Sequence, residues 1–340
     1  MDEFAPHRRT RSQSVSEVLQ EMEQGLLNPS EVALRSVPTG YPLLDDMLGG
    51  GLHTGDLVLL GGPPGVGKTI AALQWARAVA KAGHTAIFAC YEHEPLTLLT
   101  RLLALEIGEL GVVDDAFTRD LLSLIEESDA QSRGMDAVLQ GRLGAPEALQ
   151  RVREYADRLI LVRASGAHTT TGQLADLIAE HRPAGETAVL FVDYLQKIPL
   201  QPEPATESEK VTRTVEALKD LALERRLPVV LLSAVDAEGM RANRLRLYHL
   251  RGSSAIAFES DVILMLNSKE KAVAKVHLAY NTKGAQAFRD WVVMSVEKNR
   301  GGPNLIDLEF RKDFRHFRFD PEGGIVTERL VDERLDDAAL

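Results

Sequence analysis

The chain has 340 residues, 44% of them hydrophobic, and a formal net charge of −11. A chain of this size can bury the core of one large domain or two small ones, so a folded protein is expected. No apolar run approaches the roughly 18 residues that cross a bilayer, and the N-terminus lacks the apolar centre of a secretory signal. We therefore expect a cytoplasmic protein with no membrane contact. The negative charge excludes a surface that binds nucleic acid everywhere by charge alone.

Cysteine and histidine usage excludes two further kinds of site. The single cysteine, Cys90, lies in the apolar run TAIFAC, so a disulfide framework and a cysteine-based zinc site are excluded and core packing is expected. The nine histidines show no metal-ligand spacing. We expect no metal site built by the protein alone.

The first 35 residues form a basic tail and an amphipathic linker helix. Residues 1–13 are polar and are expected to be disordered, and Ser14 with Glu17 forms a capping box that starts a helix. One face of that helix is apolar, with Val15, Val18, Leu19 and Met22. This stripe packs either on its own domain or on a neighbouring subunit.

Residues 36–325 read as one α/β domain. Short apolar runs alternate with longer amphipathic segments, which is typical of a mostly parallel sheet covered by helices. We expect strands at 56–62, 85–90, 158–164, 188–193 and 228–234, and the clearest helix at 209–225. After Asp261 helices are predicted to stop, and an antiparallel extension is expected with strands at 262–267, 274–280, 290–299 and 305–310.

Two segments depart from this alternation. Residues 111–157 are charged and helical in character, which predicts a helical insertion. Residues 326–340 are expected to form a mobile acidic tail.

The segment GPPGVGKT matches the phosphate-binding P-loop pattern. An apolar strand precedes it and an alanine-rich helix follows, so backbone N–H groups and the helix N-terminus can converge on phosphate oxygens. Lys68 is expected to neutralise the β- and γ-phosphates of ATP, and the Thr69 hydroxyl to coordinate Mg²⁺. The predicted binding residues are Gly62, Pro63, Pro64, Gly65, Val66, Gly67, Lys68 and Thr69.

Asp193 is the expected second half of this site. The apolar run at 188–193 would bring it to the carboxyl edge of the sheet, beside the P-loop, where a carboxylate can hold Mg²⁺ through a water. An aspartate at a strand end is also a common cap of a turn or helix, but the P-loop favours the magnesium role.

Hydrolysis of ATP needs a base that orients and deprotonates water. The strand at 85–90 is followed by Tyr91-Glu92-His93-Glu94-Pro95, and Glu92 is the predicted base. Pro95 is expected to start the next helix, whose N-terminus Glu94 would favour. Glu94 is the alternative base.

The order of these motifs resembles the C-terminal ATPase domain of the DnaB family of replicative helicases, within the wider RecA and KaiC group. The resemblance covers roughly residues 36–320 and implies a RecA-like P-loop core. It rests on the matching segments 37–69, 192–198, 211–233, 249–266, 296–303 and 317–320.

The resemblance implies that Lys298 and Arg300 reach the γ-phosphate of ATP in a neighbouring subunit. A guanidinium supplied across an interface stabilises transition-state charge, and a Gly-Gly-Pro turn can project it from a strand end. The alternative is an exposed basic hairpin. A side chain that reaches the ATP of a neighbouring subunit can act only in an assembly, so we expect a homo-oligomer, with a hexameric ring favoured.

Two features depart from the family. Ala234 stands where the family presents a glutamine that senses the γ-phosphate, which puts the coupling of hydrolysis to loop movement in doubt. Only about 35 residues precede the match, whereas the family has a globular N-terminal domain that meets primase, so a primase partner is not expected.

Two basic clusters could bind nucleic acid locally, although such clusters are more often solvated surface. The first is in the tail and the second follows the strand at 228–234; they comprise His7, Arg8, Arg9 and Arg11, and Arg241, Arg244, Arg246 and Arg251. The second cluster occupies the region that lines the DNA channel in the family. The leading expectation is a motor on single-stranded DNA. The alternatives are a KaiC-like regulatory ATPase acting on protein partners and a RadA-like recombination accessory.

Overall fold

The computed structural model describes residues 12–27, 36–112, 134–274, 277 and 286–331. The chain divides into two units, Met1–Arg35 and Ser36–Leu340. Among the described residues, no helix is both long enough and apolar enough to span a bilayer.

The described part of the first unit contains one helix, α1 (Val15–Leu27). Its start has the predicted capping box, since the Glu17 carboxylate accepts from the Ser14 backbone N–H at 2.6 Å and the Ser14 hydroxyl accepts from the Glu17 N–H at 3.2 Å. The apolar side chains of Val15, Val18, Leu19 and Met22 are exposed. The predictions for the basic tail at residues 1–11 lie outside the described residues.

Ten strands of the second unit form one sheet in the order β11-β10-β9-β8-β3-β7-β6-β4-β5, with β12 paired to β10. The parallel strands are β3 (Leu57–Gly61), β4 (Thr85–Cys90), β5 (Leu159–Arg163), β6 (Ala188–Asp193), β7 (Val229–Ser233) and β8 (Val262–Ser268). The antiparallel strands are β9 (Trp291–Asn299), β10 (Ile306–Asp313), β11 (Arg318–Phe319) and β12 (Gly324–Ile325). The predicted α/β class, with a mostly parallel sheet and an antiparallel extension, is confirmed.

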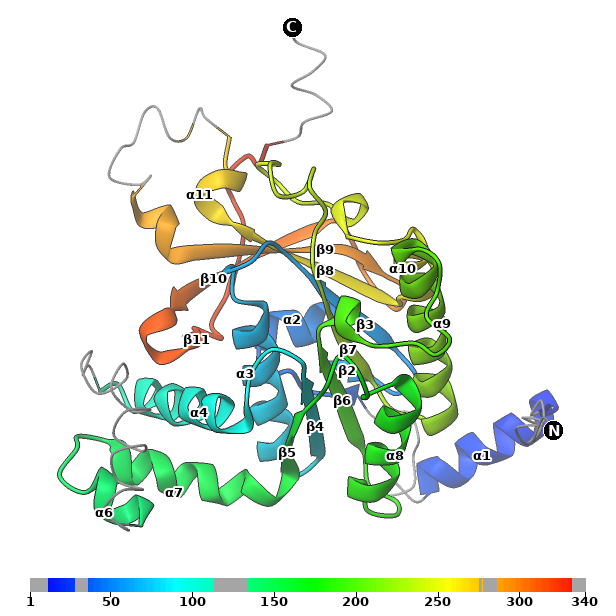
Figure 1. Ribbon diagram of the computed structural model, residues 1–340, viewed down its shortest axis with the longest axis horizontal. Helices are drawn as coiled ribbons and strands as arrows, with labels where there is room; N and C mark the ends of the chain where they lie inside the picture. Colours follow the sequence, from blue (N-terminus) through cyan, green and yellow to red (C-terminus); the bar gives the residue numbers. More distant parts are fainter. Residues whose placement is uncertain (1–11, 28–35, 113–133, 275–276, 278–285, 332–340) are drawn as a thin grey trace, which may run out of the picture. The chain divides into compact units, whose positions relative to one another are not determined.

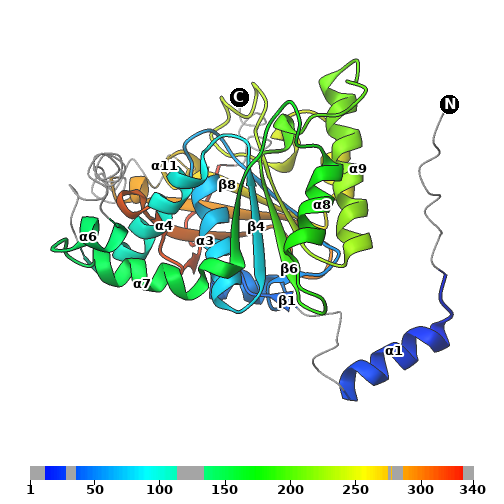
Figure 2. The same cartoon turned by 60° about the horizontal axis from the view of Figure 1, so that its bottom comes forward.

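Helices cover both faces of this sheet (Figures 1 and 2). On one face lie α3 (Lys68–Lys81), α4 (Pro95–Glu109) and α7 (Ala145–Tyr155); on the other lie α8 (Thr171–His181), α9 (Glu207–Arg225) and α10 (Ala255–Glu259). Strand side chains alternate between the two cores: Val58 and Leu60 of β3 join the α3 side, whereas Leu57 and Leu59 join the α9 side.

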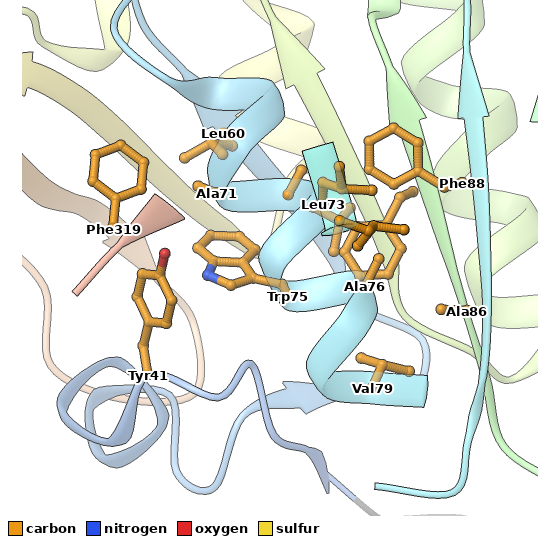
Figure 3. Packing of buried hydrophobic residues seen from close by; sticks show 14 of the residues in the cluster. Tyr41, Leu60, Ala71, Leu73, Trp75, Ala76, Val79, Ala86, Phe88 and Phe319 are labelled. Carbon is orange, nitrogen blue, oxygen red and sulfur yellow. The ribbon is translucent and has the colours of Figure 1, made fainter. Parts of the chain in front are cut away.

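Helix α3 holds the P-loop end of β3 in place because it is buried along its length. Trp75 lies at its centre, packs edge-on against Tyr41 with ring centroids 5.9 Å apart, and shares its cluster with Phe319 of β11 (Figure 3). Tyr41 precedes α2 (Pro42–Met47), which lies between β1 (Ser36–Val37) and β2 (Leu52–His53), a separate two-stranded sheet. Residues from near the beginning and the end of the sheet domain, Tyr41 and Phe319, thus pack on the helix that follows the P-loop.

The prediction that helices stop after Asp261 was wrong, because helical turns recur in the described residues, among them the 3₁₀ turns Phe288–Asp290 and Phe314–His316. A short helix, α11 (Lys269–Ala272), follows β8. Lys269 is buried there, and its ammonium pairs with Glu309 and, at 2.9 Å, with Glu328. Distant carboxylates therefore fix this turn. The two described residues of the strand expected at 274–280 do not support it, since Ala274 is in no strand and His277 is helical; the other five lie outside the described part.

The predicted insertion and tail are described in part. The insertion contributes α6 (Met135–Leu139) and α7, while residues 113–133 lie outside the described part. The backbone N–H of Val331 donates to the carbonyl of Ala272 at 2.8 Å, so the chain is held on the domain up to that residue. The prediction for 332–340 lies outside the described part.

Candidate nucleotide-binding site

The P-loop joins the end of β3 to the first residue of α3, as predicted. Gly65 and Gly67 have left-handed φ angles of 76° and 107°. A Cβ on Gly67 would lie 2.6 Å from the Phe319 ring and 2.8 Å from the Phe314 ring, so only glycine fits. Left-handed residues alternating with ordinary ones form backbone concavities that bind anions.

A cavity of about 350 Å³ lies against this loop. Its walls come from the P-loop, the ends of β4, β6 and β7, helix α4 and the segment after β10. The lining residues include Lys68, Thr69, Glu92, His93, Arg101, Asp193, Tyr194, Ala234, Phe314 and Phe317. The strand ends thus bring together the predicted P-loop residues, Asp193 and Glu92.

The Lys68 ammonium lies over the P-loop itself. It donates to the carbonyl oxygens of Gly62 at 2.7 Å and Pro63 at 3.1 Å. Burial lowers the pKa of Lys68, and the negative charges of Asp193 and Glu92 partly offset that effect. The ammonium is therefore positioned by loop carbonyls that a phosphate can replace as its partners.

Thr69 and Asp193 meet at the floor of the cavity. The Thr69 hydroxyl donates to Asp193 Oδ2 at 2.7 Å, and the Asp193 side chain is buried. Burial, together with the smaller effect of the nearby Glu92 charge, raises the pKa of Asp193 to about 6, although the Thr69 hydrogen bond and the charges of Lys68 and Arg101 act to lower it. A hydroxyl and a carboxylate are oxygen ligands of the kind that Mg²⁺ takes, so these residues fit the ion.

The two candidate bases occupy different surroundings. Glu92 is exposed and lines the cavity. Glu94 is the N-cap residue of α4, with Pro95 as the first helical residue, and its carboxylate pairs with Arg163. This arrangement favours Glu92 as the base.

Arg101, Phe314 and Phe317 line the cavity but were not predicted from the sequence. Arg101 lies on α4 with its guanidinium 5.3 Å from the Phe317 ring, and burial lowers its pKa. It lies about two turns into the helix that begins shortly after Glu92 and His93, and this closeness in sequence to the cavity residues is the signal that could have identified it. The two phenylalanines follow β10; Phe317 opens the segment 317–320 that contributes to the resemblance, whereas Phe314 belongs to no local motif.

Lys298 and Arg300 lie where the parallel strands begin, whereas the P-loop lies where they end. Lys298 pairs with Ile263 at the start of β8, which runs parallel to β3. The Arg300 guanidinium donates to Asp261 Oδ1 at 3.1 Å, and Asp261 in turn accepts from the backbone N–H of Leu57 at the start of β3. The strand between Leu57 and the P-loop spans about 16 Å at roughly 3.3 Å per residue. Neither side chain can reach its own cavity.

The same two side chains are anchored on the end of α10. The Lys298 ammonium donates to the carbonyls of Ala257 at 2.7 Å and Ser260 at 2.6 Å. The Arg300 guanidinium donates to the carbonyl of Phe258 at 2.6 Å. Burial lowers the pKa of Lys298, and the Arg300 charge lowers it further. The two cations therefore form one cluster at this edge.

The second basic cluster lies on and beside the loop of residues 236–249, here called the 236–249 loop. Arg241 is exposed on it. Arg244 forms two hydrogen bonds with Asp307, at 2.8 and 3.0 Å, and Arg246 lies 3.4 Å from the Glu297 carboxylate. Arg251, just past the loop, pairs with Glu207 at 2.8 Å. The predicted cluster is therefore partly neutralised by carboxylates.

Two relatives show the extent of the sequence similarity. The replicative DNA helicase DnaB of Treponema pallidum (strain Nichols) is 27% identical over 311 residues, which cover 88% of this chain and 61% of that protein. A probable plasmid replicative DNA helicase of Chlamydia psittaci is 26% identical over 242 residues, 69% of this chain and 47% of that protein. The chain thus spans about three fifths or less of the length of these relatives.

Two solved structures show a similar fold, and a family model shows the family. The structure described as "ATPase Domain of G40P" has a TM-score of 0.70 at 17% identity and covers 91% of this chain and 99% of that one. A DnaB-like replicative helicase, solved with its interactions with primase, has a TM-score of 0.67 at 17% identity, covering 91% and 67%. The model for the DnaB-like helicase C terminal domain matches residues 36–319, and the chain belongs to this family.

Proposed function

We propose that this chain is a Mg²⁺-dependent ATPase that acts as a helicase-type motor on single-stranded DNA. The observation that carries the proposal is the meeting of Lys68, Thr69, Asp193 and Glu92 around one cavity at the carboxyl ends of β3, β4 and β6. Family membership supports the motor over the KaiC-like and RadA-like alternatives.

Each residue of the cavity has a distinct role in this proposal. The P-loop from Gly62 to Thr69 binds the phosphates through its backbone N–H groups, and the Lys68 ammonium moves from the loop carbonyls to the β- and γ-phosphates. Thr69 and Asp193 would hold Mg²⁺, which neutralises phosphate charge when bound. Glu92 orients the attacking water and accepts its proton.

The neighbouring subunit supplies Lys298 and Arg300. Both lie at the far edge of their own sheet, so they can serve only the cavity of another copy. An arrangement in which one edge of a subunit faces the opposite edge of the next is heterologous, and such an arrangement forms a ring when the rotation between neighbours closes. We propose a homo-oligomeric ring, with a hexamer favoured.

Single-stranded DNA is the proposed partner of the 236–249 loop. Arg241 is exposed there, and a ring multiplies each exposed arginine by the number of subunits. The carboxylates beside Arg244, Arg246 and Arg251 reduce the local positive charge, and this observation favours the regulatory ATPase as a second candidate.

The ATPase rate with and without single-stranded DNA separates these two functions. If the chain is a motor on DNA, single-stranded DNA should stimulate ATP turnover at low salt. DNA binding should weaken steeply with added salt, because phosphate contacts release counterions. Turnover that DNA leaves unchanged, with no DNA bound by the ATP-loaded protein, would favour the regulatory ATPase.

A further inference from the structure

The 236–249 loop begins and ends beside the nucleotide cavity. Val235 and Leu250 form an antiparallel bridge at its base, and the Arg251 N–H donates to the carbonyl of Ala234 at 3.0 Å. Ala234 itself lines the cavity that holds Lys68 and Glu92. The two arms of the loop therefore meet at a wall of the proposed ATP site.

One side chain joins both arms of this base. Gln196 lies on the short 3₁₀ turn Leu195–Lys197, three residues after Asp193. Its Oε1 accepts from the Ala234 N–H at 3.3 Å, and its Nε2 donates to the Arg251 carbonyl at 2.9 Å and to the Ser233 hydroxyl at 3.1 Å. Both the oxygen and the nitrogen of the Gln196 amide therefore form hydrogen bonds with residues at the base of the loop.

The other end of this connection is the metal-binding carboxylate of the proposed site. Asp193 and Gln196 are separated by only two residues, Tyr194 and Leu195, and Tyr194 lines the cavity while Leu195 is buried. The Lys210 ammonium of α9 donates to the Gln196 carbonyl at 3.2 Å and holds the turn from the other side. Asp193 and Gln196 are therefore joined by a short, packed segment that is held on both sides.

We infer that Gln196 is a positioning residue that couples the nucleotide state of the cavity to the 236–249 loop. The inference rests on the proposed ATPase function. If Asp193 and Thr69 hold Mg²⁺ when nucleotide is bound, they would give up their mutual hydrogen bond, and the turn carrying Gln196 would shift against β7 together with both arms of the loop. Ala234 has a methyl side chain that cannot make these contacts, so the amide comes from the neighbouring strand end.

Amide hydrogen exchange can test the coupling, because it reports the P-loop and the 236–249 loop separately in one experiment. The full chain is compared with and without Mg²⁺ and a non-hydrolysable ATP analogue. The variants are Gln196→Ala, Gln196→Glu and, as a matched control, Gln150→Ala on the exposed side of α7. Glu at position 196 can still accept from Ala234 but cannot donate to the Arg251 carbonyl.

In the wild type, nucleotide is expected to protect the P-loop and to change exchange in the 236–249 loop by on the order of threefold to tenfold, the size of one net hydrogen bond. Gln196→Ala should keep the P-loop protection and lose the difference in the loop. Gln196→Glu should reduce that difference, and Gln150→Ala should preserve it. A purely structural role would instead loosen the loop equally with and without nucleotide, so the difference would remain.

The outcomes that overturn the inference are distinct from those that overturn the function. A wild-type P-loop that saturating nucleotide does not protect contradicts the ATPase proposal and the coupling with it. A protected P-loop with a loop that does not respond contradicts the coupling alone. The coupling is also contradicted if the 236–249 loop of either Gln196 variant responds to nucleotide as in the wild type. If Gln196→Ala fails to fold, the response of Gln196→Glu tests the coupling.

Discussion

The hydroxyl of Thr69 donates to the carboxylate of Asp193 at 2.7 Å and joins the first turn of α3 to the end of β6. The two residues are 124 positions apart in the sequence. Because both oxygens are ligands that Mg²⁺ would need, the hydrogen bond holds them at one place before nucleotide binds.

The buried carboxylate of Asp193 should destabilise the nucleotide-free protein at neutral pH. Its pKa is raised from 3.8 to about 6, so the protonated form favours the fold, and that contribution is lost as pH rises from about 4 through 6. Asp193→Asn should therefore be more stable than the wild type at pH 8, by on the order of 2 kcal/mol, with little difference near pH 4. Urea denaturation without nucleotide or Mg²⁺ measures this. Equal stability at pH 8 would contradict the burial argument.

Lys68 and Glu92 should fail in different ways. Lys68→Ala removes a cation from the phosphates and should weaken ATP binding by about tenfold or more. Glu92→Gln should retain binding and lose turnover by about 10²-fold to 10⁴-fold, because only the proton acceptor is removed. Nucleotide affinity and phosphate release are measured separately.

Glu94→Gln is the control for the base, since Glu94 pairs with Arg163. It should turn over at close to the wild-type rate. Normal hydrolysis by Glu92→Gln together with a loss in Glu94→Gln would reverse the assignment.

The arginines of the 236–249 loop should not be equivalent. Arg241→Glu, at an exposed position, should weaken DNA binding and leave the free energy of unfolding nearly unchanged. Arg244→Glu places a second negative charge beside Asp307 and should cost on the order of 2 kcal/mol of stability. Urea denaturation and DNA titration at low salt separate the two effects. Equal DNA affinity for Arg241→Glu and the wild type would remove this loop from the proposed DNA site.

Features that depend on local sequence could be predicted. Each of the five strands expected before Asp261 lies within one residue of its prediction, because buried parallel strands are short apolar runs bounded by turns. The P-loop was predicted from its sequence motif, and Asp193 from its position at the end of an apolar strand. Cys90 is buried, as its apolar run indicated.

Features that depend on contacts between residues far apart in the sequence could not be predicted. Asp307 and Glu297 neutralise two arginines that the sequence showed only as a basic cluster, and Glu309 and Glu328 fix the unexpected helix α11 around Lys269. Phe314 reaches the cavity only because β10 returns the chain to the P-loop. Such contacts join segments whose separation carries no periodic or motif signal.

Mixing two inactive variants tests most directly whether ATP is hydrolysed between neighbouring copies of this chain. Arg300→Ala should fold and bind ATP yet hydrolyse it about 10³-fold more slowly, and Lys68→Ala should also be inactive. In a randomly mixed ring of equal amounts, about one interface in four joins an intact P-loop to an intact Arg300, so hydrolysis should exceed that of either variant alone. The mixed assembly must be demonstrated, for example by co-purification through a tag on one variant. Mixed assemblies that hydrolyse ATP no faster than the separate variants would contradict the action of Arg300 on a neighbouring site.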